Sequence, residues 1–147
     1  MIQRIQSIFL LVSFCLMVSL FFVPAVELAS GEILYHFNLK GFASENGEAI
    51  DRQWSLTLFG ILVCLLNGLI IFMYRSRVLQ MRLCIYNMIL IIGMAGVCLY
   101  IVRMSPKDAV YYHLPVVFPA IAVILHYLAF RSIRKDELMV QALSRLR

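Results

Sequence analysis

Cysteine is the residue type in this sequence best suited to redox chemistry, and four are present: Cys15, Cys64, Cys84 and Cys98. A thiol oxidoreductase needs an attacking thiolate beside a resolving sulfur, and a C-x-x-C motif commonly provides that pair. This spacing does not occur here, and each cysteine lies within a long apolar run. Because buried cysteine behaves as a small hydrophobic residue, we interpret all four as packing residues.

Three histidines are candidates for binding haem or a metal ion: His36, His113 and His126. His113 and His126 lie on one expected helix and are roughly 20 Å apart at ~1.5 Å per residue, so they cannot share an iron. His36 and His113 can meet on one side of the membrane, but a metal site there needs a further ligand such as Glu32 or Asp108. The sequence contains no motif with ligand spacing, and we expect no metal, haem or other cofactor.

Three polar residues lie within apolar runs at a similar expected depth: Asn67, Asn87 and His126. Each is roughly 7–12 Å from the nearest basic residue at the end of its run. An unpaired amide in hydrocarbon is costly, so we expect these side chains to face the bundle and each other. They form either interhelical hydrogen bonds that set helix register or an intramembrane proton- or ligand-binding site, in which His126 is the titratable member.

Small residues recur every fourth position in the second apolar run, at Gly60, Cys64 and Gly68. This spacing allows another helix backbone to approach closely. Residues 93–96 of the third run form a similar thin patch. Both patches serve either as contacts within the bundle or as docking faces for another membrane subunit.

The C-terminal segment 131–147 has leucine and methionine at helical spacing, surrounded by basic residues: Arg134, Lys135, Arg145 and Arg147. This pattern predicts a basic amphipathic helix that contacts either anionic lipid headgroups or an acidic partner. The segment has no interleaved aromatic residues on which bases would stack. We therefore do not expect nucleic acid as a sequence-specific ligand.

The composition indicates which elements must position these residues. The chain has 147 residues, 63% hydrophobic and 14% charged, whereas a soluble domain is about 45–50% apolar and about 25% charged. Four uncharged runs reach the roughly 20 residues needed to span a bilayer: 5–26, 54–74, 83–102 and 111–130. We predict one all-α integral membrane domain over 1–147, a bundle of four transmembrane helices whose first helix is retained and not cleaved as a signal peptide.

Basic residues predict the orientation of the bundle. Nine flank the run ends on the side of the termini: Arg4, Arg75, Arg77, Arg82, Arg131, Arg134, Lys135, Arg145 and Arg147. Four flank the other side: Lys40, Arg52, Arg103 and Lys107. Because basic residues are retained in the cytoplasm, both termini are predicted to be cytoplasmic. The loop 27–53 is then external, and β-forming residues at 33–40 predict a small β-hairpin within it.

Both ends of the chain resemble a known family. The opening segment MIQRIQSIFL and the closing residues RKDE and SRLR resemble a family of small four-helix inner-membrane proteins of unknown function, found in the Bacteroidota. The resemblance implies a multi-pass protein of the bacterial inner membrane. It implies no catalytic residues.

No catalytic constellation is visible in the sequence, so we expect a protein that is not an enzyme. The leading interpretation is a scaffold or accessory subunit of a larger inner-membrane assembly, with the lipid bilayer and other membrane proteins as partners. The alternative is a small transporter or lipid-binding protein with a polar site near the cytoplasmic leaflet. A transporter commonly carries a buried carboxylate or paired broken helices, and neither is apparent in the sequence. A membrane oxidoreductase ranks third.

Overall fold

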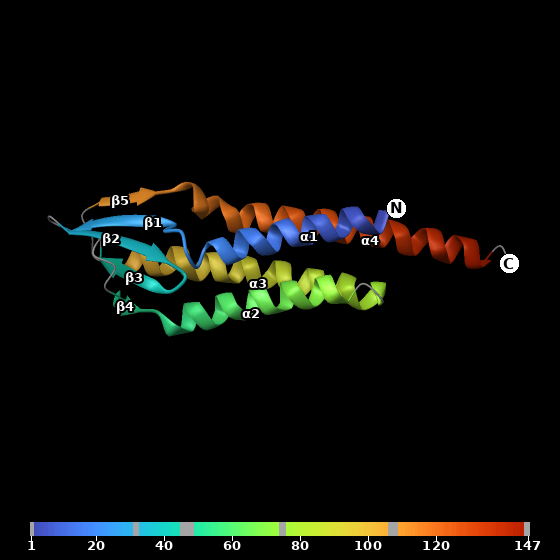
Figure 1. Ribbon diagram of the computed structural model, residues 1–147, viewed down its shortest axis with the longest axis horizontal. Helices are drawn as coiled ribbons and strands as arrows, with labels where there is room; N and C mark the ends of the chain where they lie inside the picture. The colour runs from blue at the N-terminus through green and yellow to red at the C-terminus, as the bar shows by residue number, and fades with distance from the viewer. Residues whose placement is uncertain (1, 31–32, 45–48, 74–75, 106–108, 146–147) are drawn as a thin grey trace.

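A computed structural model describes residues 2–30, 33–44, 49–73, 76–105 and 109–145 of the chain. The molecule is elongated, with helices along its long axis and a β-sheet at one end (Figure 1). The first and the last described residues both lie toward the end of the bundle that is away from the sheet. The two ends of the molecule therefore differ in structure, one covered by the sheet and the other carrying both termini.

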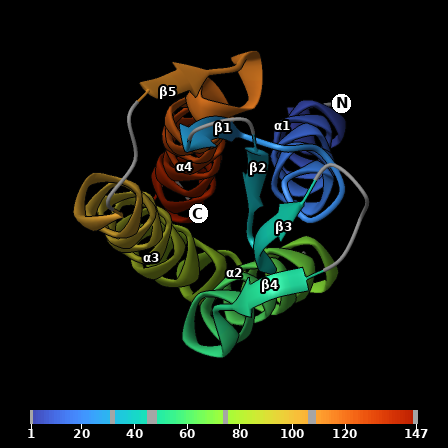
Figure 2. The same cartoon turned by 90° about the vertical axis from the view of Figure 1, so that its left-hand side faces the viewer.

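Four α-helices lie within the described residues: α1 (Ile2–Ser19), α2 (Trp54–Phe72), α3 (Arg77–Met104) and α4 (Phe118–Arg145). Each helix packs against the next in sequence, and α1 also packs against α4, so the four enclose a common core (Figure 2). In the described part of the chain, three segments are long and apolar enough to cross a membrane: Trp54–Phe72, Val78–Met104 and Leu114–Val140. Over Gln6–Ser19, α1 is a shorter apolar helix.

As far as the described residues extend, the sheet has five antiparallel strands in the order β4-β3-β2-β1-β5. The segment between α1 and α2 supplies β1 (Val26–Ser30), β2 (Ile33–Asn38), β3 (Gly41–Ser44) and β4 (Ala49–Arg52). The connection between α3 and α4 supplies the edge strand β5 (Ala109–Tyr112), which pairs with β1. The sheet is therefore more extensive than the small hairpin expected from the sequence, and it joins both connections at this end of the bundle.

The turn between β2 and β3 depends on glycine, because Gly41 has φ of 118°, a left-handed conformation that few other residues adopt. The preceding Leu39 anchors the turn to the bundle. Its N–H donates to the carbonyl of Leu20 at 3.3 Å, and its carbonyl accepts from Thr57 Oγ1 at 2.9 Å. These bonds hold the sheet against the ends of α1 and α2.

The prediction of a helix over 5–26 was wrong at its C-terminal end, because α1 ends at Ser19. The apolar run continues past Ser19 because its later residues include buried positions of strand β1. Val26 and Leu28 of β1 are buried, at 3% and 0% exposed, where the sheet covers the bundle core. Hydrophobicity here reflects burial under a sheet, and a run of apolar residues does not distinguish a buried strand from a helix.

The predicted bounds of the fourth helix, 111–130, were also wrong. Tyr111 and Tyr112 belong to β5, and a 3₁₀ turn at Leu114–Val117 precedes α4. At its other end α4 continues without interruption through Arg145, so the predicted tail helix is an extension of α4. Similarly, α3 begins at Arg77 and ends at Met104, beyond both predicted boundaries of 83–102.

Two buried hydrophobic clusters fill the bundle. The larger one joins the sheet to the helices, and its central aromatic pair is Phe37 and Phe42, with ring centroids 4.8 Å apart. The smaller one lies toward the termini and contains Leu10, Ile70 and Ile133. The outward faces of the helices are also apolar: Leu58, Leu65, Ile89 and Ile124 are each 58–63% exposed. Apolar side chains on both faces are typical of a helix surrounded by lipid.

Candidate functional site

The helices bring four polar side chains together in the core, one from each helix: Ser13, Asn67, Asn87 and His126, all 0% exposed. Asn87 Nδ2 lies 2.8 Å from His126 Nε2. On the other side of the imidazole, Ser13 Oγ lies 3.0 Å from His126 Nδ1. Asn67 Nδ2 donates to Ser13 Oγ at 3.4 Å. We call these four residues the polar layer.

The surroundings of His126 determine which ring nitrogen carries the hydrogen. Nδ1 lies 2.9 Å from the carbonyl oxygen of Ala122, which only accepts hydrogen bonds, so Nδ1 is the donor. The lone pair on Nε2 then accepts from the Asn87 amide. The neutral imidazole with its hydrogen on Nδ1 therefore satisfies both ring nitrogens.

Two amide oxygens of the polar layer, Asn67 Oδ1 and Asn87 Oδ1, have no hydrogen-bond partner within the described part of the chain. A buried polar atom left unpaired costs about 1–3 kcal/mol. The layer is therefore tightly connected at its centre but has unused acceptor capacity at its two asparagines.

Apolar layers enclose the polar layer on both sides. On the sheet side lie Met17, Val63, Ile91 and Ala122, all fully buried. On the side of the termini lie Leu10, Ile70, Cys84 and Ala129, also fully buried. Each of these residues is three or four positions from the polar residue of its own helix, so the layers stack directly. This arrangement favours interhelical hydrogen bonding over passage of a solute.

The sequence predicted that Asn67, Asn87 and His126 lie together, and the structure places them together. Sequence reasoning missed Ser13, although it lies in the apolar first run at a comparable depth. A serine gives a weak signal because its hydroxyl can bond to the carbonyl of the preceding turn and needs no partner on another helix.

The predicted glycine and cysteine ladder on α2 divides into two parts. A Cβ at Gly60 would lie 2.9 Å from Phe21 Cζ, so a side chain at this position would require the Phe21 ring to shift. At Gly68 an added Cβ would meet nothing within 4 Å. Cys64 and Gly68 instead line an apolar groove of about 380 Å³ between α1 and α2, together with Phe14, Val18, Phe21, Ile61, Leu65, Leu69 and Phe72.

A second polar cluster lies on the sheet. Glu27 on β1 contacts both His36, with Oε1 3.2 Å from Nδ1, and His113, with Oε2 3.0 Å from Nε2. The contact with His36 is not aligned as a hydrogen bond. The two histidines do approach one another, but the acid between them is Glu27, whereas the predicted candidates Glu32 and Asp108 lie outside the described residues.

No group of three or more histidine, cysteine or acidic side chains in the described ranges is arranged to hold a metal ion. The Glu27 cluster connects β1 with β2 and with the residue that follows β5. The four cysteines are all unpaired.

The predicted basic tail lies on α4, which extends past the end of the bundle (Figure 1). Arg134 and Lys135 are exposed. Between them and the end of the helix, Asp136 accepts a hydrogen bond of 2.7 Å from Gln6 of α1. The side chain of Arg145 and the whole of Arg147 lie outside the described residues.

Comparison with known proteins gives a family and no activity. No curated protein matches the chain. One family model, described as a domain of unknown function (DUF4293), matches residues 2–146. This match covers nearly the whole sequence and agrees with the resemblance to an uncharacterised family. The chain belongs to the DUF4293 family.

Proposed function

We propose that this protein is a non-enzymatic accessory subunit that docks a transmembrane helix of a larger assembly in the groove between α1 and α2. In this proposal the chain spans a bacterial inner membrane with both termini in the cytoplasm and the sheet outside. The basic extension of α4 then contacts anionic lipid or an acidic segment of the same partner.

The observation that carries the proposal is the apolar groove between α1 and α2 that Gly68 lines. A glycine costs a helix about 1 kcal/mol relative to alanine, and at Gly60 the packing of Phe21 explains the glycine. At Gly68 no described residue fills the space, and the groove around it is lined by apolar side chains. Close approach of a second backbone at a small residue is a common mode of helix association in membranes.

The polar layer supports a role as a rigid platform. Hydrogen bonds link Ser13 to Asn67, Ser13 to His126 and Asn87 to His126, which connects all four helices. These bonds oppose sliding of one helix past another, so the groove keeps a constant shape. The alternative, a transporter that uses the same cluster, requires a path to His126. The two apolar layers on either side of the cluster make that alternative the weaker one.

Substitution at Gly68 tests the proposal. Gly68→Leu fills the groove and should remove partner proteins that copurify with the wild-type chain from native membranes in a mild detergent. The matched control is Gly96→Leu on α3, where an added Cβ also meets nothing within 4 Å. We expect Gly96→Leu to retain the partners. If wild-type protein purifies without stoichiometric partners, or if Gly68→Leu retains them, the proposal is wrong.

A further inference from the structure

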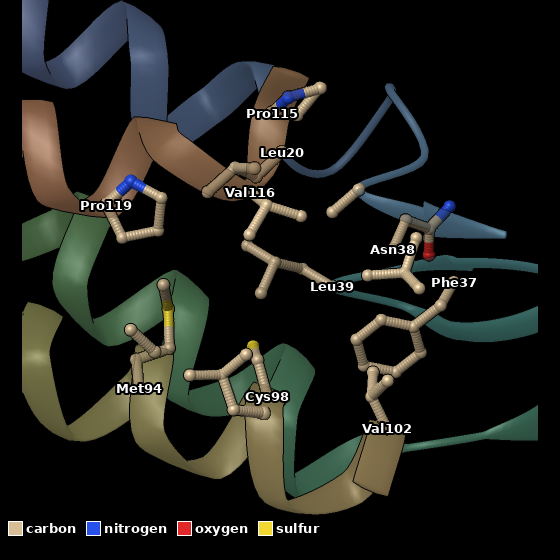
Figure 3. A pocket seen from close by; sticks show the side chains of 14 residues that line it. Leu20, Phe37, Asn38, Leu39, Met94, Cys98, Val102, Pro115, Val116 and Pro119 are labelled. Atoms are coloured by element: carbon tan, nitrogen blue, oxygen red, sulfur yellow. The ribbon is translucent and has the colours of Figure 1, made fainter. Parts of the chain in front are cut away.

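A cavity separate from the polar layer lies where the sheet meets the helices (Figure 3). It encloses about 80 Å³. Phe37 and Leu39 line it from the sheet side, Met94, Cys98 and Val102 from α3, and Pro119 from the start of α4. Asn38 is the polar exception, and its Oδ1 already accepts from the backbone N–H of Lys40 at 2.8 Å.

The cavity is adjacent to the surface that faces lipid. Leu99 is one of its lining residues and is 52% exposed. Leu99 lies in the candidate span Val78–Met104, and Pro119 lies in the candidate span Leu114–Val140. At this level the chain forms a 3₁₀ turn at Leu114–Val117 in place of a regular helix start. The hollow therefore lies at the sheet-side end of two membrane-spanning segments.

We propose that this cavity holds the end of one phospholipid acyl chain from the leaflet next to the sheet. Its walls offer almost no hydrogen-bonding groups, and a water molecule needs two to four such partners. A cavity of roughly 150 Å³ accommodates benzene, so this smaller space admits a few methylene groups. A helix, with a diameter of about 10 Å, does not fit.

Arg103 provides charge complementarity for the same lipid. It follows the cavity-lining Val102 in the last turn of α3 and is exposed. A basic side chain at the end of a span extends toward the headgroup level, where lipid phosphates lie. One phospholipid thus contacts the protein twice, with its chain end in the cavity and its phosphate on Arg103. This binding is independent of partner docking in the α1–α2 groove.

Photocrosslinking with wild-type protein tests the occupant directly. The purified chain is reconstituted into vesicles of phosphatidylglycerol that contain a small fraction of lipid with a diazirine at the acyl terminus. After irradiation, mass spectrometry maps the adducts. We expect adducts to concentrate at Met94, Cys98 and Val116. If labelling depends only on how exposed a residue is to lipid, Ile89 and Ile124 will be labelled as strongly as the cavity residues. That result would overturn the proposal.

Two variants extend the test. Cys98→Phe fills the cavity and should lower labelling of Val116 about 10-fold or more, because a few buried methylenes are lost from the bound state. Gly96→Phe adds the same ring on the open face of α3 and should leave the labelling unchanged. Circular dichroism and thermal unfolding confirm that each variant is folded. Unchanged labelling in folded Cys98→Phe would contradict the assignment.

Arg103→Gln tests the headgroup contact. Loss of one basic residue near the lipid surface should lower cavity labelling about fivefold, and Arg103→Lys should retain most of it. If Arg103→Gln leaves the labelling unchanged, the assignment of the phosphate to Arg103 is wrong. The Gly68→Leu variant should not affect lipid labelling. A negative result for lipid binding therefore leaves the proposal of partner docking standing, and a negative result for partner docking leaves the lipid proposal standing.

Discussion

Asn87 on α3 donates a hydrogen bond of 2.8 Å to Nε2 of His126 on α4. The bond joins two helices at a level where both side chains are fully buried. Its direction is determined by a third residue, since the carbonyl of Ala122 requires the hydrogen of the imidazole to be on Nδ1. A single backbone carbonyl thereby selects the tautomer that Asn87 recognises.

A double-mutant cycle should detect this bond. We expect Asn87→Leu and His126→Leu each to lower the free energy of unfolding, with a coupling energy of about 0.6–1.7 kcal/mol, as for other interhelical hydrogen bonds in membranes. The measurement is unfolding in mixed micelles. As a control, Gln80→Leu removes a bond to the carbonyl of Ile70, and it should be additive with His126→Leu. Additive effects of Asn87→Leu and His126→Leu would contradict the contact.

The two α2 glycines should respond oppositely to alanine. At Gly60 the added Cβ would lie 2.9 Å from Phe21 Cζ and 3.2 Å from Leu39 Cδ1. Such overpacking destabilises a fold by about 1–3 kcal/mol. Gly68→Ala meets no atom within 4 Å and should stabilise the helix by up to about 1 kcal/mol. Thermal unfolding in detergent compares the two, and equal effects would show that Gly60 is not tightly packed.

Loss of the Glu27 carboxylate should loosen the edge strand β5. Glu27→Gln removes the charge that contacts His36 and His113, and a partly exposed pair of this kind contributes about 0.2–1 kcal/mol. We expect amide hydrogen exchange in Ala109–Tyr112 to accelerate by up to about fivefold. Glu137→Gln, on the distant part of α4, is the matched control. Unchanged exchange in Glu27→Gln would mean that backbone pairing with β1 is sufficient.

The proposed orientation places Ser44 and Ser144 on opposite sides of the membrane. In a background without native cysteines, Ser44→Cys should react with an impermeant maleimide added to intact cells, because it lies at the sheet end. Ser144→Cys, near the end of α4, should react only after the membrane is permeabilised. External labelling of Ser144→Cys with protection of Ser44→Cys would reverse the orientation.

Truncation of the α4 extension should leave insertion of the bundle into the membrane intact and weaken its association with partner proteins. Deletion of residues 137–147 keeps Asp136 and its hydrogen bond to Gln6, so the bundle should still insert and resist carbonate extraction. Each basic residue near an anionic surface contributes about 1 kcal/mol. We therefore expect partner copurification to weaken and to become more sensitive to salt. Normal copurification of the truncated protein would show that the extension is only a solvated flank.

The sequence by itself was sufficient for features that depend on local composition. The sequence predicted four membrane-spanning helices from four uncharged apolar runs, and among the described residues three of those runs coincide with helices long and apolar enough to cross a bilayer, because hydropathy and length suffice to identify such a helix. The first run contains the shorter apolar helix Gln6–Ser19. The depth of Asn67, Asn87 and His126 also followed from the sequence, since each residue adds a constant rise along a helix. Residues at one depth that avoid lipid must converge, and these three do.

Only the tertiary structure decided features that depend on which faces meet. Val26 and Leu28 continue an apolar run yet form a strand, and their pairing partners in β5 are distant in sequence. Ser13 joined the polar layer because α1 packs beside α4. The equal spacing of Gly60 and Gly68 concealed their different roles, because Phe21 reaches the first and not the second. Spacing identifies a helix face, whereas the packing of neighbouring segments determines what that face contacts.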